Sequence, residues 1–563
     1  MVRRILTKLA SPVRGLHQAA YVLAGFTLVS QLLALLRDRL FAHQFGASEI
    51  LDVYYAAFKI PDLLFALIVS LVSAYVLIPR LAKLESENDT TGVQHLLSQT
   101  ATFLLLAGGA ISIVATVFAP SVVRILFPTL AMGAHGDELV FLTRLLLIQP
   151  IILGLSSILG SVTQLGRRFV LFALSPVLYN LGIIAGAYYL YPVVGVIGIG
   201  AGVLVGALLH LSIHVIIVLR AGVFPRLVIP SPRVLWEIIS HSVPRSLALA
   251  MGSVTTLLLV ALASRTGEGG VSVFTLAGNL EAVPLSLVGA AYATAAFPVM
   301  AQQIGSARLA EFKQTVTAAC RHILFWSSII MVLVIVLRAH LVRVILGSGA
   351  FNWDDTRLTA AVLAVLIIGL LAQGIILLAA RAFYAANRSW NPFIVQLGDA
   401  GISVAVAYGL LSLSRTHPMV QYFVEALFRV ENVAGSSVLF IAIGATIGQL
   451  VMGAVALYTL GSVAPGVARS LTRPLFEGVG AGILGGGAAY IVLRMLGTLA
   501  PLTHLFVVFA QGAIAGIVGL VVAFAVLALL ENQEIKDLYA SLKKISSFKA
   551  LQPYAPIHDN LDS

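Results

Sequence analysis

Several ionisable side chains lie close together near the N-terminus, in a stretch that otherwise has the composition of a membrane helix. The stretch LALLRDRLFAHQFGASEILDVYYAAFKIPDLL contains Arg37, Asp38, Asp52 and Lys59. A charged side chain at membrane depth costs several kcal/mol, so such groups should face a protein interior or a water-filled cavity. The pattern therefore predicts a pathway through the membrane for a polar substrate.

The composition sets the class of protein. Of 563 residues, 59% are hydrophobic and only 10% are charged, whereas charged residues make up about a quarter of a soluble domain. We therefore predict an all-α polytopic membrane protein. The formal net charge of +11 comes from basic residues in short loops between apolar segments, which indicates membrane topology and not nucleic-acid binding. The single cysteine, Cys320, excludes an internal disulfide and a cysteine metal cluster.

Apolar stretches of about 20 residues, bounded by charge, Gly or Pro, predict about fourteen transmembrane helices. The expected spans are 19–45, 49–82, 95–126, 137–163, 168–191, 195–219, 234–263, 271–303, 314–346, 355–386, 390–411, 436–460, 475–496 and 503–530. A weak echo between the two halves, for example of Pro61 by Pro284, predicts two pseudo-symmetric six-helix bundles followed by two extra helices. The expected division is a basic leader 1–18, bundles 19–220 and 221–460, two helices in 461–530 and a tail 531–563.

Basic residues alternate between the predicted loops in the way that the positive-inside rule requires. Loops with Arg80 and Lys83, or with Arg167 and Arg168, fall on the same side as the basic leader and the tail. Both termini are therefore expected in the cytoplasm. Three arginines on the opposite side are exceptions to this pattern: Arg265, Arg415 and Arg429.

Ordered motifs along the chain resemble one family. The run LLRDRLFAHQFGASEILDVYYAAFKIPDLL, then LTRLLLIQP, RFVLFALSPVLYN, GAFNWDDT and RAFYAANRSWNP, is similar to the MurJ/MviN lipid II flippases of the multidrug/oligosaccharidyl-lipid/polysaccharide exporter superfamily. The resemblance covers about residues 20–530. It implies a multi-pass protein of the bacterial cytoplasmic membrane that moves lipid II, a polyprenyl-pyrophosphate-linked precursor of peptidoglycan, from the inner to the outer leaflet by alternating access. Membrane lipids and cell-wall synthesis proteins would be its partners.

The resemblance also implies roles for the charged residues of the opening stretch. A guanidinium is a bidentate fork for phosphate oxygens, so Arg37 is expected to recognise the pyrophosphate, with Lys59 as a supporting charge. Asp38 and Asp52 are expected to orient those cations or to act in gating. The alternative is that Arg37 and Asp38 form a purely structural pair.

The chain departs from the family where that family lines its cavity with arginines. The aligned positions hold Gln31, Phe65 and Asn279; Gln31 and Asn279 still donate amide hydrogen bonds and are expected to contact substrate. Arg144 and Arg245 are candidate replacements, or else interfacial residues. Three alternatives therefore stay open beside a divergent lipid II flippase: a flippase for another lipid-linked oligosaccharide, a small-cation or drug antiporter, and a non-transporting envelope scaffold.

The remaining candidates concern coupling and chemistry. Glu281 is expected to neutralise a cavity cation or to carry a proton, with a structural pair as the alternative. Asp399 is a candidate site for a coupling Na⁺ or H⁺, and no other cofactor is expected. His210 and His214 stand one turn apart but have no third ligand nearby, so they predict interfacial histidines and no metal site. Walker, GxSxG and HExxH motifs are absent from the sequence, which predicts a transporter and not an enzyme.

Overall fold

The computed structural model describes residues 16–71, 74–499 and 504–537, and every regular element in these ranges is helical. Within them, twelve helical stretches are long and apolar enough to cross a membrane. The predicted class, an all-α polytopic membrane protein, is therefore confirmed, whereas the exact count of fourteen spans is not. The two expected spans outside the twelve are the first two, 19–45 and 49–82.

The first two expected spans fold differently from one another. Helix α2 (Leu16–Phe45) covers the first as one continuous helix. The second is divided into α3 (Glu49–Ala57), α4 (Lys59–Leu71) and α5 (Ala74–Ser86). Pro61 has no backbone N–H to donate to the carbonyl of Ala57, so the helix is interrupted at Phe58. The interruption makes Lys59 the first residue of a new helix.

The first bundle is built around α13, which packs against α10 and α11, while α11 also packs against α2. Close approach of α11 and α13 depends on glycine, because a Cβ on Gly182 would collide with the backbone of Gly206. After α5, the elements of this bundle in chain order are α6 (Thr90–Phe103), η1 (Leu104–Gly108), α7 (Gly109–Leu126), α8 (Pro128–Ala131), α9 (Gly136–Leu146), α10 (Gln149–Leu165), α11 (Phe169–Ala185), η2 (Gly186–Leu190), α12 (Tyr191–Val194) and α13 (Val196–Arg220).

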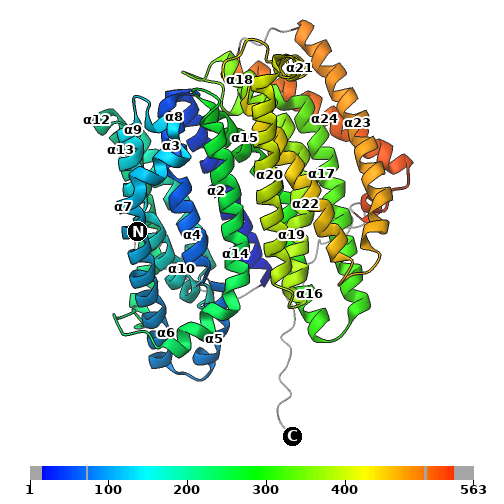
Figure 1. Ribbon diagram of the computed structural model, residues 1–563. Helices are drawn as coiled ribbons and strands as arrows, with labels where there is room; N and C mark the ends of the chain where they lie inside the picture. The colour runs from blue at the N-terminus through cyan, green and yellow to red at the C-terminus, as the bar shows by residue number, and fades with distance from the viewer. Residues whose placement is uncertain (1–15, 72–73, 500–503, 538–563) are drawn as a thin grey trace, which may run out of the picture.

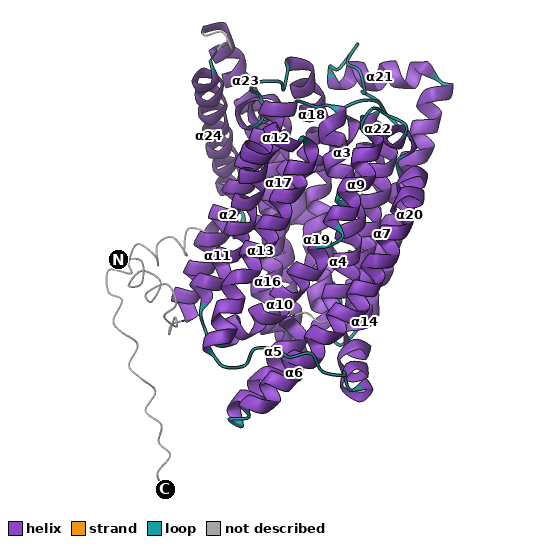
Figure 2. Cartoon of the chain, turned by 90° about the vertical axis from the view of Figure 1, so that its left-hand side faces the viewer, coloured by secondary structure: helices purple, strands orange, loops and turns teal. Residues whose placement is uncertain are grey.

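The second bundle follows a linker that begins after α13 (Figures 1 and 2). In it, α20 packs between α14 and α22, and α14 also packs against α4 of the first bundle. Its elements are α14 (Pro232–Ala263), α15 (Gly270–Leu285), η3 (Ser286–Ala290), α16 (Ala291–Gly305), α17 (Leu309–Ile345), α18 (Trp353–Leu366), η4 (Ile367–Gly369), α19 (Leu370–Ala385), α20 (Trp390–Thr416), α21 (Pro418–Phe428) and α22 (Val438–Leu460).

The last two helices, α23 (Val467–Leu499) and α24 (Leu505–Leu529), pack against each other and against α17. Glycines make the contact close, since a Cβ on Gly485 would collide with the backbone oxygen of Gly519. The expected domain borders stay predictions. Residues 1–15 of the expected leader and 538–563 of the expected tail lie outside the described residues.

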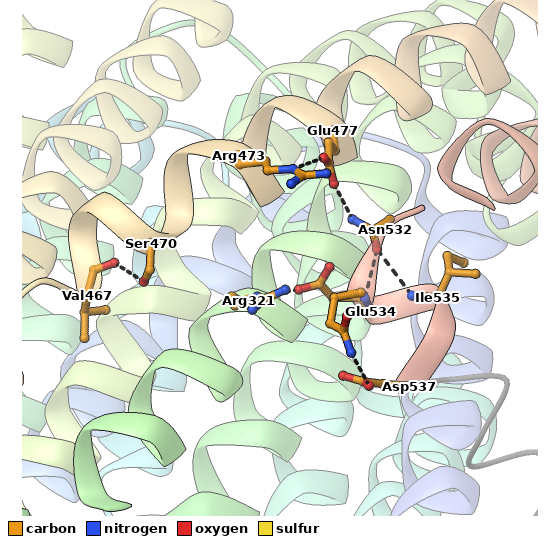
Figure 3. A network of polar contacts seen from close by, with 10 residues as sticks. Arg321, Val467, Ser470, Arg473, Glu477, Asn532, Glu534, Ile535 and Asp537 are labelled. Atoms are coloured by element: carbon orange, nitrogen blue, oxygen red, sulfur yellow. Dashed lines mark hydrogen bonds and ion pairs between the residues drawn. The ribbon is translucent and has the colours of Figure 1, made fainter. Parts of the chain in front are cut away.

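A polar cluster fastens the segment after α24 to the second bundle (Figure 3). Arg321 of α17 donates to the carboxylate of Glu534 at 2.6 Å, and the Glu534 side chain is only 2% exposed. The amide of Asn532 donates to Glu477 of α23 at 2.7 Å, and Glu477 also accepts from Arg473. These contacts join α17, α23 and the chain beyond α24 at one point.

Candidate functional site

A network around Asp38 joins the two bundles. Arg37 Nε and Nη2 both donate to Asp38 Oδ1, at 3.0 and 2.8 Å, and Arg37 Nη1 lies 3.4 Å from Asn180 Oδ1 on α11. On the other side, Asn279 Nδ2 of α15 donates to Asp38 Oδ2 at 2.9 Å. Only 18% of the Arg37 side chain is exposed. In this conformation the guanidinium is therefore held by Asp38, and binding of a phosphate by Arg37 stays a prediction.

Asp52 connects the bundles without a cation. Its side chain is fully buried; Oδ2 accepts from the Gly269 backbone N–H at 2.8 Å, and Oδ1 accepts from the backbone N–H and the hydroxyl of Ser272, at 2.7 and 2.6 Å. These donors belong to the first turn of α15, where free N–H groups and the helix dipole favour a carboxylate. Among the described residues no Lys or Arg pairs with Asp52, so the structure does not show the predicted orientation of a cation. Asp52 thus joins the two bundles, and its role in gating stays a prediction.

Further hydrogen bonds close the same end of the interface. Arg39 Nη1 donates to the carbonyl of Val344 at 2.6 Å, the Ala350 N–H donates to the carbonyl of His43 at 2.9 Å, and the Thr129 hydroxyl donates to the carbonyl of Ser264 at 2.6 Å. All three join the first bundle to the second. The end of the interface that contains α3 and the start of α15 is therefore sealed by polar contacts.

Next to this sealed end, a cavity of about 290 Å³ opens between α4 and the second bundle. Its lining includes Lys59, Asn279, Glu281 and Asp399, which come from three different helices and were assigned separately from the sequence. An adjoining cavity of about 390 Å³ shares Lys59 with it and is also lined by Asp62 and Phe65. Folding thus brings four of the predicted residues together at the bundle interface.

The polar groups that line the 290 Å³ cavity differ in how many hydrogen bonds they make. Among the described residues, the Lys59 ammonium has no hydrogen bond and no carboxylate within 4.0 Å, and its electrostatic partner is Asp62 of the same helix. Glu281 Oε1 accepts from Gln373 Nε2 of α19 at 2.6 Å, and Asp399 Oδ1 accepts from the Ser403 hydroxyl at 3.2 Å. Gln449 Oε1, which also lines the cavity, is buried without a hydrogen-bond partner. The lining therefore offers one cation that makes no hydrogen bond to the described residues, and several oxygen acceptors.

The other residues proposed to contact substrate are placed less centrally. Gln31 is half-buried on α2 and lines neither cavity. Arg144 is exposed on α9 and donates through Nε to the carbonyl of Thr116 at 3.1 Å, and Arg245 lies over the ring of Tyr384, 5.9 Å from its centroid. Neither arginine lines the two cavities, so the structure does not support them as replacements for cavity arginines.

His214 on α13 is fully buried in the protein, and the expected position of the two histidines at the membrane interface stays a prediction. His214 Nδ1 lies 3.0 Å from the Thr163 hydroxyl, and His210 Nδ1 lies 2.6 Å from the Ser156 hydroxyl. Both hydroxyls belong to α10. The two histidines are thus packing residues with local hydrogen bonds inside the first bundle.

Three polar residues of the site were given no role from the sequence. Asp62 stands three residues after Lys59 on one helix, a spacing that places two side chains on the same face, so this signal was available. Asn180 belongs to a family motif, which gives no hint of its contact with Arg37. Gln373 binds Glu281 from 92 residues away, and no local pattern reveals such a contact.

Comparisons with known proteins agree with the motifs and the fold. A family model described as lipid II flippase MurJ matches residues 41–419, a range that includes Lys59 and Asp399 and begins just after Arg37. The lipid II flippase MurJ of Burkholderia cenocepacia is 25% identical over 424 residues, which are 70% of this chain and 81% of that protein.

Solved structures share the fold. A lipid II flippase MurJ in an inward closed conformation matches with a TM-score of 0.69 at 19% identity, over 91% of this chain and all of that one. An inward-facing multidrug resistance transporter of the MATE family matches with a TM-score of 0.62 at 16% identity, over 77% of this chain and 96% of that one. Because the family model spans most of the sequence, this chain belongs to the lipid II flippase MurJ family.

Proposed function

We propose that this protein moves lipid II from the inner to the outer leaflet of the bacterial cytoplasmic membrane, by alternating access between the bundles α2–α13 and α14–α22. The observation that carries the proposal is the cavity at the bundle interface, which is lined by the ammonium of Lys59 together with the polar side chains of Asn279 and Glu281. Membership of a flippase family supports it. The protein is a transporter and not an enzyme, and it crosses the membrane many times.

Recognition of the pyrophosphate begins at Lys59 and is completed by Arg37. A phosphate oxygen competes with Asp38 for the guanidinium, because a bidentate Arg–phosphate pair has the same geometry as an Arg–carboxylate pair. When Arg37 releases Asp38, the hydrogen bond between Asn279 and Asp38 also weakens. Substrate binding is in this way connected to the contact between the bundles.

Opening of the sealed end requires the contacts of Asp52 with the start of α15 to break. These are hydrogen bonds to a carboxylate, and water can replace both partners, so the net free energy of each exchange is about 1.5–3 kcal/mol. A seal of this kind closes firmly and still exchanges between two states whose free energies differ by a few kcal/mol. The opposite end of the interface would then close in turn.

A coupling cation, Na⁺ or H⁺, belongs to the same proposal. Glu281, Asp399 and Gln449 line one cavity, and carboxylate and amide oxygens are the ligands that hard cations prefer. Entry of a cation offsets the excess of carboxylates over the single Lys59 ammonium. The basic loops further support cytoplasmic termini, and cell-wall synthesis proteins are the expected partners.

Reconstitution tests the proposal without a species-specific partner. Purified protein in vesicles is given fluorescent lipid II in one leaflet, and its appearance in the other is measured for the native chain and for Arg37→Glu, Lys59→Gln and Arg144→Gln. Flipping by the native chain and by Arg144→Gln, but not by Arg37→Glu or Lys59→Gln, is expected. An inactive native chain would contradict the lipid II assignment.

The same vesicle assay also distinguishes the alternative functions. Movement of another polyprenyl-pyrophosphate oligosaccharide but not of lipid II indicates a related flippase. Export of a small cationic dye, unaffected by Arg37→Glu, indicates an antiporter of the kind that the MATE-like fold allows. A well-folded chain that moves none of these is a scaffold.

A further inference from the structure

Helix α21 exposes an apolar face that the transport cavity does not use. The 11-residue helix shows Met419, Tyr422, Phe423 and Leu427 to the outside, and these side chains are 62–80% exposed. At 100° per residue they fall on one side of the helix. A face of this kind is unfavourable in water and marks a surface that meets another apolar phase.

The opposite face of α21 is fixed to the second bundle. Val424 is buried, and Val420 and Phe428 pack against the large core of the interface. The buried Glu425 accepts from the Ser436 hydroxyl at 2.6 Å and from the Gln421 amide at 2.8 Å. The apolar side is therefore outward because the inner side is held by specific contacts.

The position of α21 places it at the membrane surface. It runs crosswise to α20 and α22 at the end of the bundle (Figure 2). The 27 residues of α20 span about 40 Å, more than the roughly 30 Å of hydrocarbon in a bilayer. Trp390, half exposed at the other end of α20, is typical of one interface. The end of α20 at Thr416 then reaches the headgroup layer on the other side.

An arginine lies at each end of α21. Arg415 precedes α21 and Arg429 ends it in a left-handed conformation; both are exposed. The Arg429 carbonyl accepts from Arg357 at 2.6 and 3.1 Å, which fixes its backbone, and Arg338 of α17 lies within electrostatic range of its charge. The one acidic residue of α21, Glu425, faces inward. The outward surface thus combines an apolar face with positive ends.

We propose that α21 lies in the headgroup layer of the bilayer and binds anionic phospholipid, with its apolar face toward the acyl chains and Arg415 and Arg429 on the phosphates. This combination of aromatic face and basic ends is what an interfacial helix needs. It also gives a reason for arginines that break the topology rule. The family match ends at residue 419, so α21 lies almost wholly outside it.

A spin label at the apolar face tests the proposal in the full chain. The one cysteine, Cys320, is fully buried, so Phe423→Cys can be labelled in an otherwise native protein, with the native chain as the blank. Glu431→Cys is the control, because Glu431 follows α21 and is 51% exposed. In vesicles of phosphatidylcholine with phosphatidylglycerol, collisions of the label with oxygen and with a water-soluble nickel chelate are compared.

Oxygen collisions several-fold above nickel collisions at position 423, with the reverse at 431, are expected. Equal nickel access at both positions would overturn the proposal, and so would spin–spin broadening at 423, which indicates a second copy on the face. Replacing Arg415 and Arg429 together by Gln should lower the preference for acceptor-labelled phosphatidylglycerol over phosphatidylcholine near position 423 by roughly tenfold. An unchanged preference would refute the role of the anionic lipid.

Discussion

The side-chain amide of Asn279 donates to Asp38 Oδ2 at 2.9 Å, while Arg37 is bonded to Oδ1 of the same carboxylate. One carboxylate is thus shared between an arginine of the first bundle and an amide of the second. The resemblance to the family led us to expect an arginine at the position of Asn279, and the contact with Asp38 is one that an arginine could also make. A substitution of Asn279 therefore also affects Arg37, because both residues bind the carboxylate of Asp38.

Substitution of Asn279 should separate charge from hydrogen bonding. Asn279→Asp places two carboxylates next to each other, so we expect lipid II flipping in vesicles to fall by about tenfold or more, the effect of about 1.4 kcal/mol. Asn279→Arg keeps a donor for Asp38 and adds a cation, so it should flip at least as fast as the native chain. Equal loss in both variants would contradict the role given to this bond.

Lys59 should matter through its charge. Lys59→Gln removes the cation that lines both cavities, and loss of one charge-assisted contact of about 1.5–3 kcal/mol weakens substrate binding roughly 10- to 100-fold. Lys59→Arg should retain most of the affinity. Binding of fluorescent lipid II to the purified protein measures this. The matched control is Lys83→Gln, since Lys83 is exposed on α5 outside the cavities; a similar loss there would argue against a specific site.

Asp52 should stabilise the sealed end. Asp52→Ala leaves the Gly269 and Ser272 donors buried without an acceptor, which should cost about 2 kcal/mol or more. Asp52→Asn keeps one acceptor oxygen and should cost less. Thermal unfolding of the detergent-solubilised protein measures both. Glu49→Gln is the control on the same short helix, and the prediction fails if Asp52→Ala unfolds at the same temperature as the control.

Two glycines of α23 form a matched pair. A Cβ on Gly485 would collide with the backbone oxygen of Gly519 on α24, whereas a Cβ on Gly487 meets nothing within 4 Å. Gly485→Ala should therefore destabilise the protein by about 1–3 kcal/mol. Gly487→Ala should be neutral or stabilise it by about 0.5–1 kcal/mol, the helix preference of Ala over Gly. Thermal midpoints of the two variants in one detergent give the comparison, and the opposite order would show that α23 and α24 pack otherwise.

The ion pair of Glu534 should hold the segment after α24. Glu534→Gln leaves Arg321 without its carboxylate, and because the arginine is about a third exposed, the cost should be about 1–3 kcal/mol and not the full amount for a buried pair. Faster proteolysis of the chain after α24 is the expected result. Glu531→Gln removes an exposed pair with Lys536 and should have no measurable effect; equal cleavage of both variants would rule out the proposed anchor.

The sequence by itself determined the class, the helical segments and the family. These are local properties: a membrane helix needs about 20 apolar residues in a row, and the motifs are short runs such as KIPDLL and RAFYAANRSWNP. The glycine-rich stretch 478–489 is visible in the sequence, and Gly485 in it meets the backbone of Gly519. The polar groups Lys59, Glu281 and Asp399 stood out in apolar surroundings, whereas Asn279 was chosen through the resemblance to the family.

Only the tertiary structure decided which of these groups meet. Asp52 binds Ser272 across 220 residues and Glu281 binds Gln373 across 92, and nothing in either local stretch specifies the partner. The packing of the helices also decided that Arg37 is held by Asp38 and that Arg144 lies away from the cavity. Apolar helices resemble one another in sequence, so their neighbours are set by the shapes of whole surfaces, which a single sequence does not display.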